Sequence, residues 1–167
     1  LVLFDDALVD LFQVRATRRV TMDWLLHGLS TATAPQGFAA MTGPIFKDAG
    51  YQHLTDLVRR ADVADLTMEW PLSGGRVLRC RLFCDAPATA TFGKGIGYHL
   101  TDRVPFIMLT REGESAAFAA VYDLAGDGGL CPGAAARLDP AGEMVVEVPR
   151  GVGKARVSWD GTGLKVE

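Results

Sequence analysis

Hydrophobic and polar residues alternate with a period of two along most of this chain. Residues 20–27 are the clearest case, with Val20, Met22, Trp24 and Leu26 on one face and Thr21, Asp23, Leu25 and His27 on the other. Such alternation predicts a β-strand with one buried face and one more polar face. The same pattern predicts further strands at 8–16, 52–61, 64–71, 77–84, 104–111, 115–123, 143–148 and 154–159.

Turn-forming residues separate these alternating runs. They lie at 73–75, 111–114, 139–142 and 160–163, and clusters of this kind connect neighbouring strands. No convincing helix is longer than two turns, and residues 29–50 form the longest irregular stretch. A connection of that length is usually a functional or flexible loop. We therefore expect an all-β fold, an antiparallel β-sandwich with short strands and tight turns, formed by residues 1–167 as a single domain.

Composition narrows the class of protein only a little. Apolar residues make up 49% and charged residues 22%, with a net charge of −3, which is typical of a globular domain. There is no basic stripe, so we expect no nucleic-acid partner. No apolar run approaches the ~18 residues that span a membrane, so we expect no membrane partner either. The chain opens on Leu1 with a strand-like segment and no leader pattern, and we expect it to be excised from a longer protein.

The cysteines and the glycine-rich segment carry little chemical signal. Cys80 and Cys84 lie roughly 13 Å apart along one strand face, too far to share a metal, and core packing is the favoured interpretation. Cys131 follows a glycine pair with nothing nearby to activate it. Residues 93–98 are glycine-rich but lack the spacing and the following helix of a phosphate loop, which favours a mobile loop. Known hydrolase and zinc-protease motifs are absent.

His27 is the most informative of the three histidines. It ends a strand on the face opposite the apolar stripe and precedes Gly28. That position suits acid–base or charge-stabilising work, because glycine lets a ligand or another chain approach. The alternative is a histidine that only hydrogen-bonds a neighbouring loop, and the residues alone leave both open. His53 begins another strand, and His99 ends the glycine-rich segment.

Several short segments, taken in order, resemble one known family. They are Val9-Asp10-Leu11-Phe12-Gln13-Val14, Asp23-Trp24-Leu25-Leu26-His27-Gly28, Tyr51-Gln52-His53-Leu54, Leu82-Phe83-Cys84-Asp85-Ala86-Pro87, Pro105-Phe106-Ile107-Met108, Arg111-Glu112-Gly113 and Ala117-Phe118. Their order over residues 5–125 resembles the β-sandwich domain of heparinase II/III-like polysaccharide lyases. Members of that family join an N-terminal helical toroid to such a sandwich and cleave uronate polysaccharides by β-elimination.

The resemblance implies a role for this chain in a lyase. It would be the C-terminal domain of an enzyme acting on an acidic polysaccharide, with the toroid of the same parent chain as its partner. His27 matches the sandwich histidine of the family, and its expected catalytic role is to bind or polarise the uronate, through an imidazolium contact. The isolated chain should be inactive, because the toroid carries the base. A periplasmic or secreted location follows from the family alone.

Other site residues follow from the same resemblance. Tyr51 and His53 lie where the family carries substrate contacts, and a half-buried Tyr51 at a strand start is the alternative. Some members hold a zinc in the sandwich, for which His27 and Asp48 would be ligands here. The strand 77–84 offers Arg79 and Arg81 in place of another histidine, so we expect no metal and no other cofactor.

A second class of function stays open beside the lyase. A non-catalytic carbohydrate-binding or interaction sandwich would present an exposed aromatic platform. Trp24, Trp70 and Trp159 instead fall on or beside apolar stripes, which favours the lyase domain. The polysaccharide is not specified, although a net charge of −3 disfavours strong binding of a highly sulfated chain by this piece alone.

Overall fold

Ten antiparallel strands form two sheets in this computed structural model, which describes residues 1–28, 31–43, 45–46, 49–99, 101–126 and 129–167. The larger sheet has the order β1-β2-β6-β5-β4-β3, with β1 (Val2–Leu3), β2 (Ala7–His27), β3 (Ala39–Ala40), β4 (Thr55–Pro71), β5 (Val77–Ile96) and β6 (Arg103–Asp123). The smaller sheet has the order β10-β9-β8-β7, with β7 (Ala135–Leu138), β8 (Met144–Arg150), β9 (Gly153–Trp159) and β10 (Leu164–Val166). Three short helical turns complete the described chain, η1 (Tyr51–His53), η2 (Ser73–Gly75) and α1 (Leu130–Gly133). The expected all-β, sandwich-like fold is confirmed.

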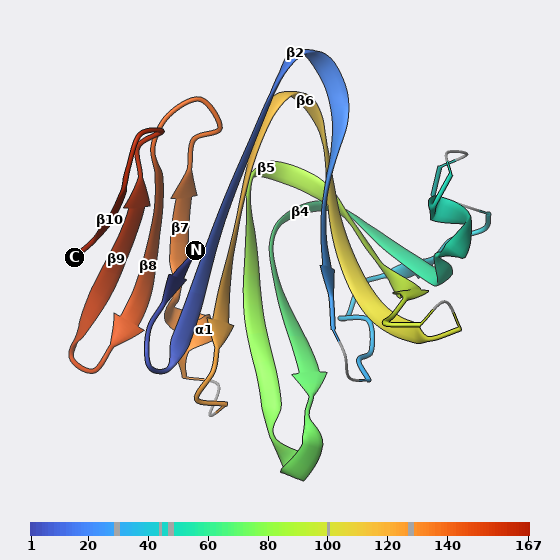
Figure 1. Cartoon of the computed structure of the whole chain (residues 1–167), viewed down its shortest axis with the longest axis horizontal. Helices are drawn as coiled ribbons and strands as arrows, with labels where there is room; N and C mark the ends of the chain where they lie inside the picture. The colour runs from blue at the N-terminus through green and yellow to red at the C-terminus, as the bar shows by residue number, and fades with distance from the viewer. Residues whose placement is uncertain (29–30, 44, 47–48, 100, 127–128) are drawn as a thin grey trace.

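The four central strands are 17 to 21 residues long and bend sharply near their middles (Figure 1). Register shifts mark the bends between Arg15 and Val20 of β2 and between Cys84 and Thr89 of β5. An interruption of the ladder lets a strand turn without ending. The expectation of short strands is therefore wrong for these four. Pairs of predicted segments, such as 8–16 and 20–27, are the two arms of one strand.

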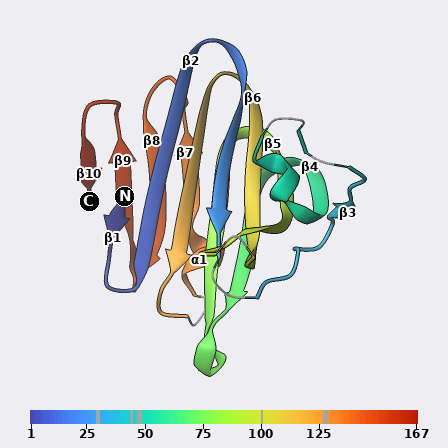
Figure 2. The same cartoon turned by 45° about the vertical axis from the view of Figure 1, so that its right-hand side comes forward.

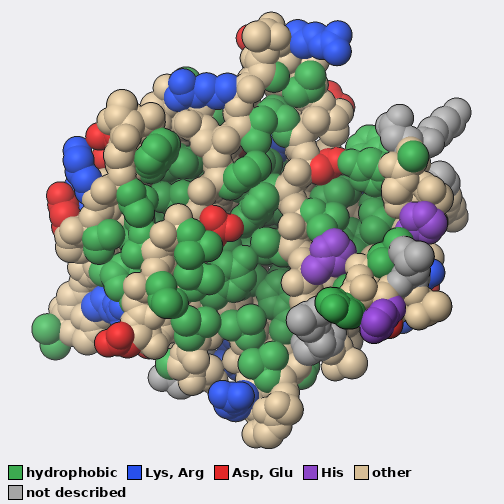
Figure 3. Space-filling model, in the orientation of Figure 1, with side chains coloured by type: hydrophobic (Ala, Val, Ile, Leu, Met, Phe, Trp, Pro, Cys, Tyr) green, Lys and Arg blue, Asp and Glu red, His purple; other side chains and the backbone are tan. Residues whose placement is uncertain are grey.

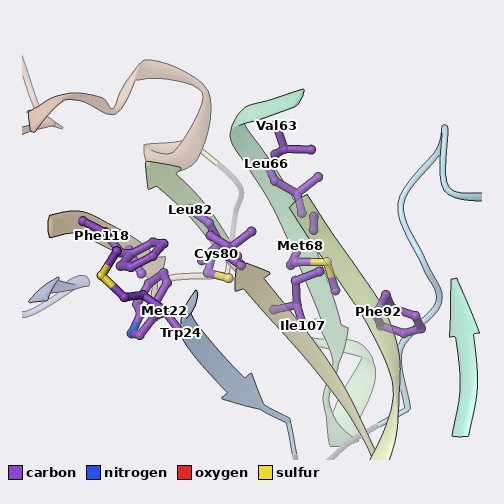
Figure 4. Close-up of a cluster of buried hydrophobic side chains, with 14 of the residues drawn as sticks. Met22, Trp24, Val63, Leu66, Met68, Cys80, Leu82, Phe92, Ile107 and Phe118 are labelled. Atoms are coloured by element: carbon purple, nitrogen blue, oxygen red, sulfur yellow. The ribbon is translucent and has the colours of Figure 1, made fainter. Parts of the chain in front are cut away.

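Bending divides the larger sheet into two halves that face each other. We call 7–15, 65–71, 77–84 and 115–123 half-sheet A, and 20–27, 55–63, 89–96 and 103–113 half-sheet B. Side chains from both halves meet in one buried cluster (Figure 4), in which the rings of Trp24 and Phe118 stack with centroids 5.5 Å apart. Cys80 is fully buried there and Cys84 packs against the cluster. The core-packing interpretation of these two cysteines is confirmed.

The smaller sheet packs on the other face of half-sheet A (Figure 2). Its buried valines, among them Val146 and Val157, meet Val9 and Val121 of the larger sheet. The outer face of half-sheet B is covered by the segment that leads into β4, where Met41, Ile45, Phe46, Tyr51 and Leu54 pack over the sheet. The molecule thus has layers in the order small sheet, half-sheet A, half-sheet B, covering segment. Among the described residues, no helix is long and apolar enough to cross a membrane.

Candidate functional site

The outer face of half-sheet B carries most of the residues that the sequence singled out. Because Met22, Trp24 and Leu26 point inward to the core, the alternation of β2 turns Asp23, Leu25 and His27 outward. Figure 3 shows the histidine side chains gathered on one part of the surface, at the right of the view. We call the outer face of half-sheet B, together with the segment that covers it (Met41, Ile45, Phe46, Tyr51 and Leu54), the histidine face.

His27 ends β2 and pairs with Phe106 of β6, and the two ring centroids lie 6.0 Å apart. The imidazole reaches across β6 towards Gly95 of β5, where a Cβ would lie 2.8 Å from His27 Nε2 and 3.2 Å from Leu54 Cδ2. Because Gly95 has no side chain, those of His27 and Leu54 can lie directly over its backbone. Partial burial lowers the pKa of His27 below 6.5, because an imidazolium is less well solvated there.

The glycine-rich segment is largely a strand rather than the mobile loop we expected. β5 continues to Ile96, and Gly93 and Gly95 pair with β6. A Cβ on Gly93 would lie 2.7 Å from Leu57 Cδ2 and 3.0 Å from Phe106 Cε1. The glycines let side chains of neighbouring strands pack directly over β5. A glycine-rich strand of this kind has the same sequence pattern as a glycine-rich loop.

Tyr51 is tied to the sheet by its hydroxyl. That hydroxyl donates to Asp23 Oδ2 at 2.6 Å, while the hydroxyl of Thr110 donates to Asp23 Oδ1 at 2.6 Å. The ring of Tyr51 also meets Phe46 edge-on, with centroids 4.8 Å apart. Sequence reasoning missed Asp23 and Thr110 as partners of Tyr51. The available signal was that Asp23 shares the outward face with His27.

His53 lies in η1 with an exposed side chain, and its Nε2 is 3.3 Å from Gln52 Nε2. The turn leads directly into Leu54, which lies beside His27 over Gly95. His27 and His53 therefore belong to the same surface. The hydroxyl of Tyr51 lies farther away, because Asp23 precedes His27 by four residues, or roughly 13 Å along a strand.

The arginines considered in connection with a metal lie elsewhere. Arg79 donates to Glu69 Oε1 at 2.6 Å, and Arg81 donates to Asp65 Oδ2 at 3.0 Å and to the carbonyl of Ala134 at 2.8 Å. Both belong to half-sheet A and not to the histidine face. In the part of the chain that the structure describes, no group of three or more His, Cys, Asp or Glu side chains could hold a metal ion. Asp48 lies outside the described residues.

Fold and site together define the class of this protein. It is an all-β, sandwich-like protein that presents an exposed strand-end histidine on a loop-covered sheet face. Comparisons with protein-family models, curated proteins and solved structures found no match for the chain.

Proposed function

We propose that the chain is the sandwich domain of a heparinase II/III-like lyase that acts on an acidic polysaccharide. The observation that carries this proposal is His27, whose imidazole is accessible at the end of β2 and lies over a glycine. His53, which is exposed in η1 on the same face, would supply a second polar contact. A polysaccharide laid along the histidine face could meet both side chains. The toroid of the parent chain would close the cleft and supply the base.

Elimination from a uronate sets three chemical requirements. The C5 proton must be removed, the C6 carboxylate must be stabilised as charge develops, and O4 must be protonated as it leaves. Since the pKa of His27 is lowered, its imidazole is mostly neutral at neutral pH and carries one donor and one acceptor. We propose that it hydrogen-bonds the substrate in this form. Stabilising the carboxylate by charge would then fall to groups of the toroid.

The roles of the neighbouring residues follow from their contacts. The hydroxyl of Tyr51 is engaged by Asp23, so Tyr51 holds the turn that carries His53. Its expected direct contact with substrate stays a prediction. His53 has an exposed imidazole that can donate to or accept from a sugar hydroxyl.

The test is made on the parent enzyme with a panel of uronate polysaccharides. β-Elimination leaves an unsaturated uronate, which is followed by its ultraviolet absorbance. We expect the His27→Ala variant to lose turnover by roughly two to four orders of magnitude while its circular dichroism is unchanged. Lys154→Ala, which removes an exposed side chain of β9 in the smaller sheet, is the control and should retain activity. Activity that survives His27→Ala would contradict the role of His27 and leave the family assignment standing.

One observation supports the alternative of a carbohydrate-binding sandwich. Tyr98 is 89% exposed, and its ring meets that of His99 edge-on with centroids 4.9 Å apart. An exposed aromatic ring packs well on the apolar face of a sugar, whereas Trp24 and Trp70 are buried. No absorbance change with any polysaccharide, together with binding that Tyr98→Ala abolishes, would favour this alternative.

A further inference from the structure

A cavity opens between the two half-sheets at the end of β2, where Leu26, His27 and Gly28 form part of its wall. Its volume is about 560 Å³, and its apolar walls come from Leu26 of β2, Leu78 of β5 and Trp70 of β4. Leu72, which is 40% exposed, also lines it. Cavities of this size, largely apolar with a few polar groups, are typical of small-molecule sites.

Polar groups on the cavity wall are rich in hydrogen-bond donors. Trp70 is 4% exposed, and its buried indole N–H has no hydrogen-bond partner among the described residues. That N–H lies against Gly28, where a Cβ would come within 2.0 Å of Nε1. The phenol of Tyr122 also lines the cavity, and burial raises its pKa well above 10. A buried donor without an acceptor is unfavourable, so an acceptor brought by a ligand would be stabilised here.

Arg76 places a positive charge on the wall of this cavity. It directly follows η2, and its carbonyl accepts from the N–H of Leu72 at 2.7 Å, which closes the turn. The side chain is exposed and forms no ion pair with any described residue. None of the described residues that line the cavity is acidic. The site therefore favours an anion with acceptor oxygens over a cation.

We propose that this cavity binds a small carboxylate with an apolar body. The apolar part would lie against Leu26, Leu72 and Leu78, and the carboxylate would meet the guanidinium of Arg76. A uronate sugar shares the carboxylate but not the apolar body. The leucine-rich walls favour the apolar carboxylate, because sugar hydroxyls would lose hydration there without partners. The cavity adjoins the histidine face, because His27 also lines it, but binding of an apolar carboxylate there does not depend on the proposed lyase function.

Decanoate is the probe. Its binding is measured through the indole N–H signals of the 167-residue chain in ¹H–¹⁵N spectra. The signal of Trp70 is assigned by its absence in Trp70→Phe. We expect decanoate to shift this signal saturably. Arg76→Gln should weaken binding by roughly ten- to a hundredfold, since a hydrogen-bonded charge pair is lost. Decanol, which lacks the charge, should bind the wild type and Arg76→Gln with similar affinity.

Arg18→Gln is the matched control. Arg18 is exposed at the bend of β2, whereas the cavity lies at the end of that strand, beside Leu26. It should leave decanoate affinity unchanged. Absence of a saturable shift in the wild type would overturn the proposal, as would equal affinity in Arg76→Gln or an equal loss in Arg18→Gln. Tighter binding of a uronate trisaccharide than of decanoate at the same signal would overturn the apolar class of ligand.

Discussion

At the scale of single residues, His27 is the most consequential side chain of the histidine face. It is exposed enough to meet a substrate, yet Phe106, Leu54 and the backbone of β5 remove part of its solvent. This desolvation lowers its pKa from 6.5. The neutral imidazole is thus the form that the folded protein favours.

The titration of His27 can be measured directly. We expect its ring signals in NMR spectra to titrate with a midpoint below 6.5, with the assignment made from His27→Gln. The unfolded chain binds the proton first as the pH falls, so the free energy of unfolding should decrease below about pH 7. His27→Gln should remove that part of the decrease. A midpoint above 6.5 would contradict the role of burial.

At the scale of elements, the bends of the long strands divide the larger sheet into its two halves. A buried ion pair lies at the bend of β5. The side chain of Asp85 is 6% exposed, and it pairs with Arg111 of β6 at 3.2 Å. Asp85 also accepts from the N–H of Ala117 at 3.0 Å, and Arg111 donates to the carbonyl of Pro87 at 2.9 Å. These bonds satisfy groups that the interrupted ladder leaves unpaired. They tie the bend of β5 to that of β6.

Removal of Asp85 tests this connection. Asp85→Ala leaves the largely buried Arg111 without its ion-pair partner, so we expect a loss of about 3–5 kcal/mol in the free energy of unfolding. The double variant Asp85→Ala/Arg111→Met carries no uncompensated charge and should lose less than Asp85→Ala alone. Urea denaturation measures both. A double variant that loses the sum of the two single effects would show that the pair does not couple the bends.

At the scale of the whole molecule, the layers depend on both faces of half-sheet A. One face meets half-sheet B and the other meets the smaller sheet. This explains the run of fully buried residues in β6 that surrounds Phe118, which consists of Ala116, Ala117, Ala119 and Ala120. A strand covered on both faces has no solvent-facing positions, so its sequence is apolar throughout rather than alternating.

The smaller sheet should contribute measurably to stability through Val146. This residue is fully buried between the two sheets, and Val146→Ala should lower the free energy of unfolding by about 2 kcal/mol. Val152 lies exposed in the β8–β9 turn, and Val152→Ala is the matched control with little expected effect. Equal stability of the two variants would show that the smaller sheet adds little to the core.

Much of the local structure was predictable from the sequence. The period of two placed residues 20–27 on a strand with His27 outward, because alternation follows directly from strand geometry. The same reasoning placed Cys80 in the core. It could not recognise that 8–16 and 20–27 are one bent strand, because residues that end a strand and residues that bend it have the same character. Nor could it pair Tyr51 with Asp23, 28 residues away.

The sequence by itself thus determined the all-β class, the inward and outward faces of the strands and the position of His27 at a strand end. These features depend on local periodicity and on the burial of apolar side chains. Only the tertiary structure decided that β5 places Gly95 under His27 and that Trp70, Arg76 and Tyr122 share one cavity. Such juxtapositions arise from strand register and bending, which are set by contacts between residues far apart in the chain.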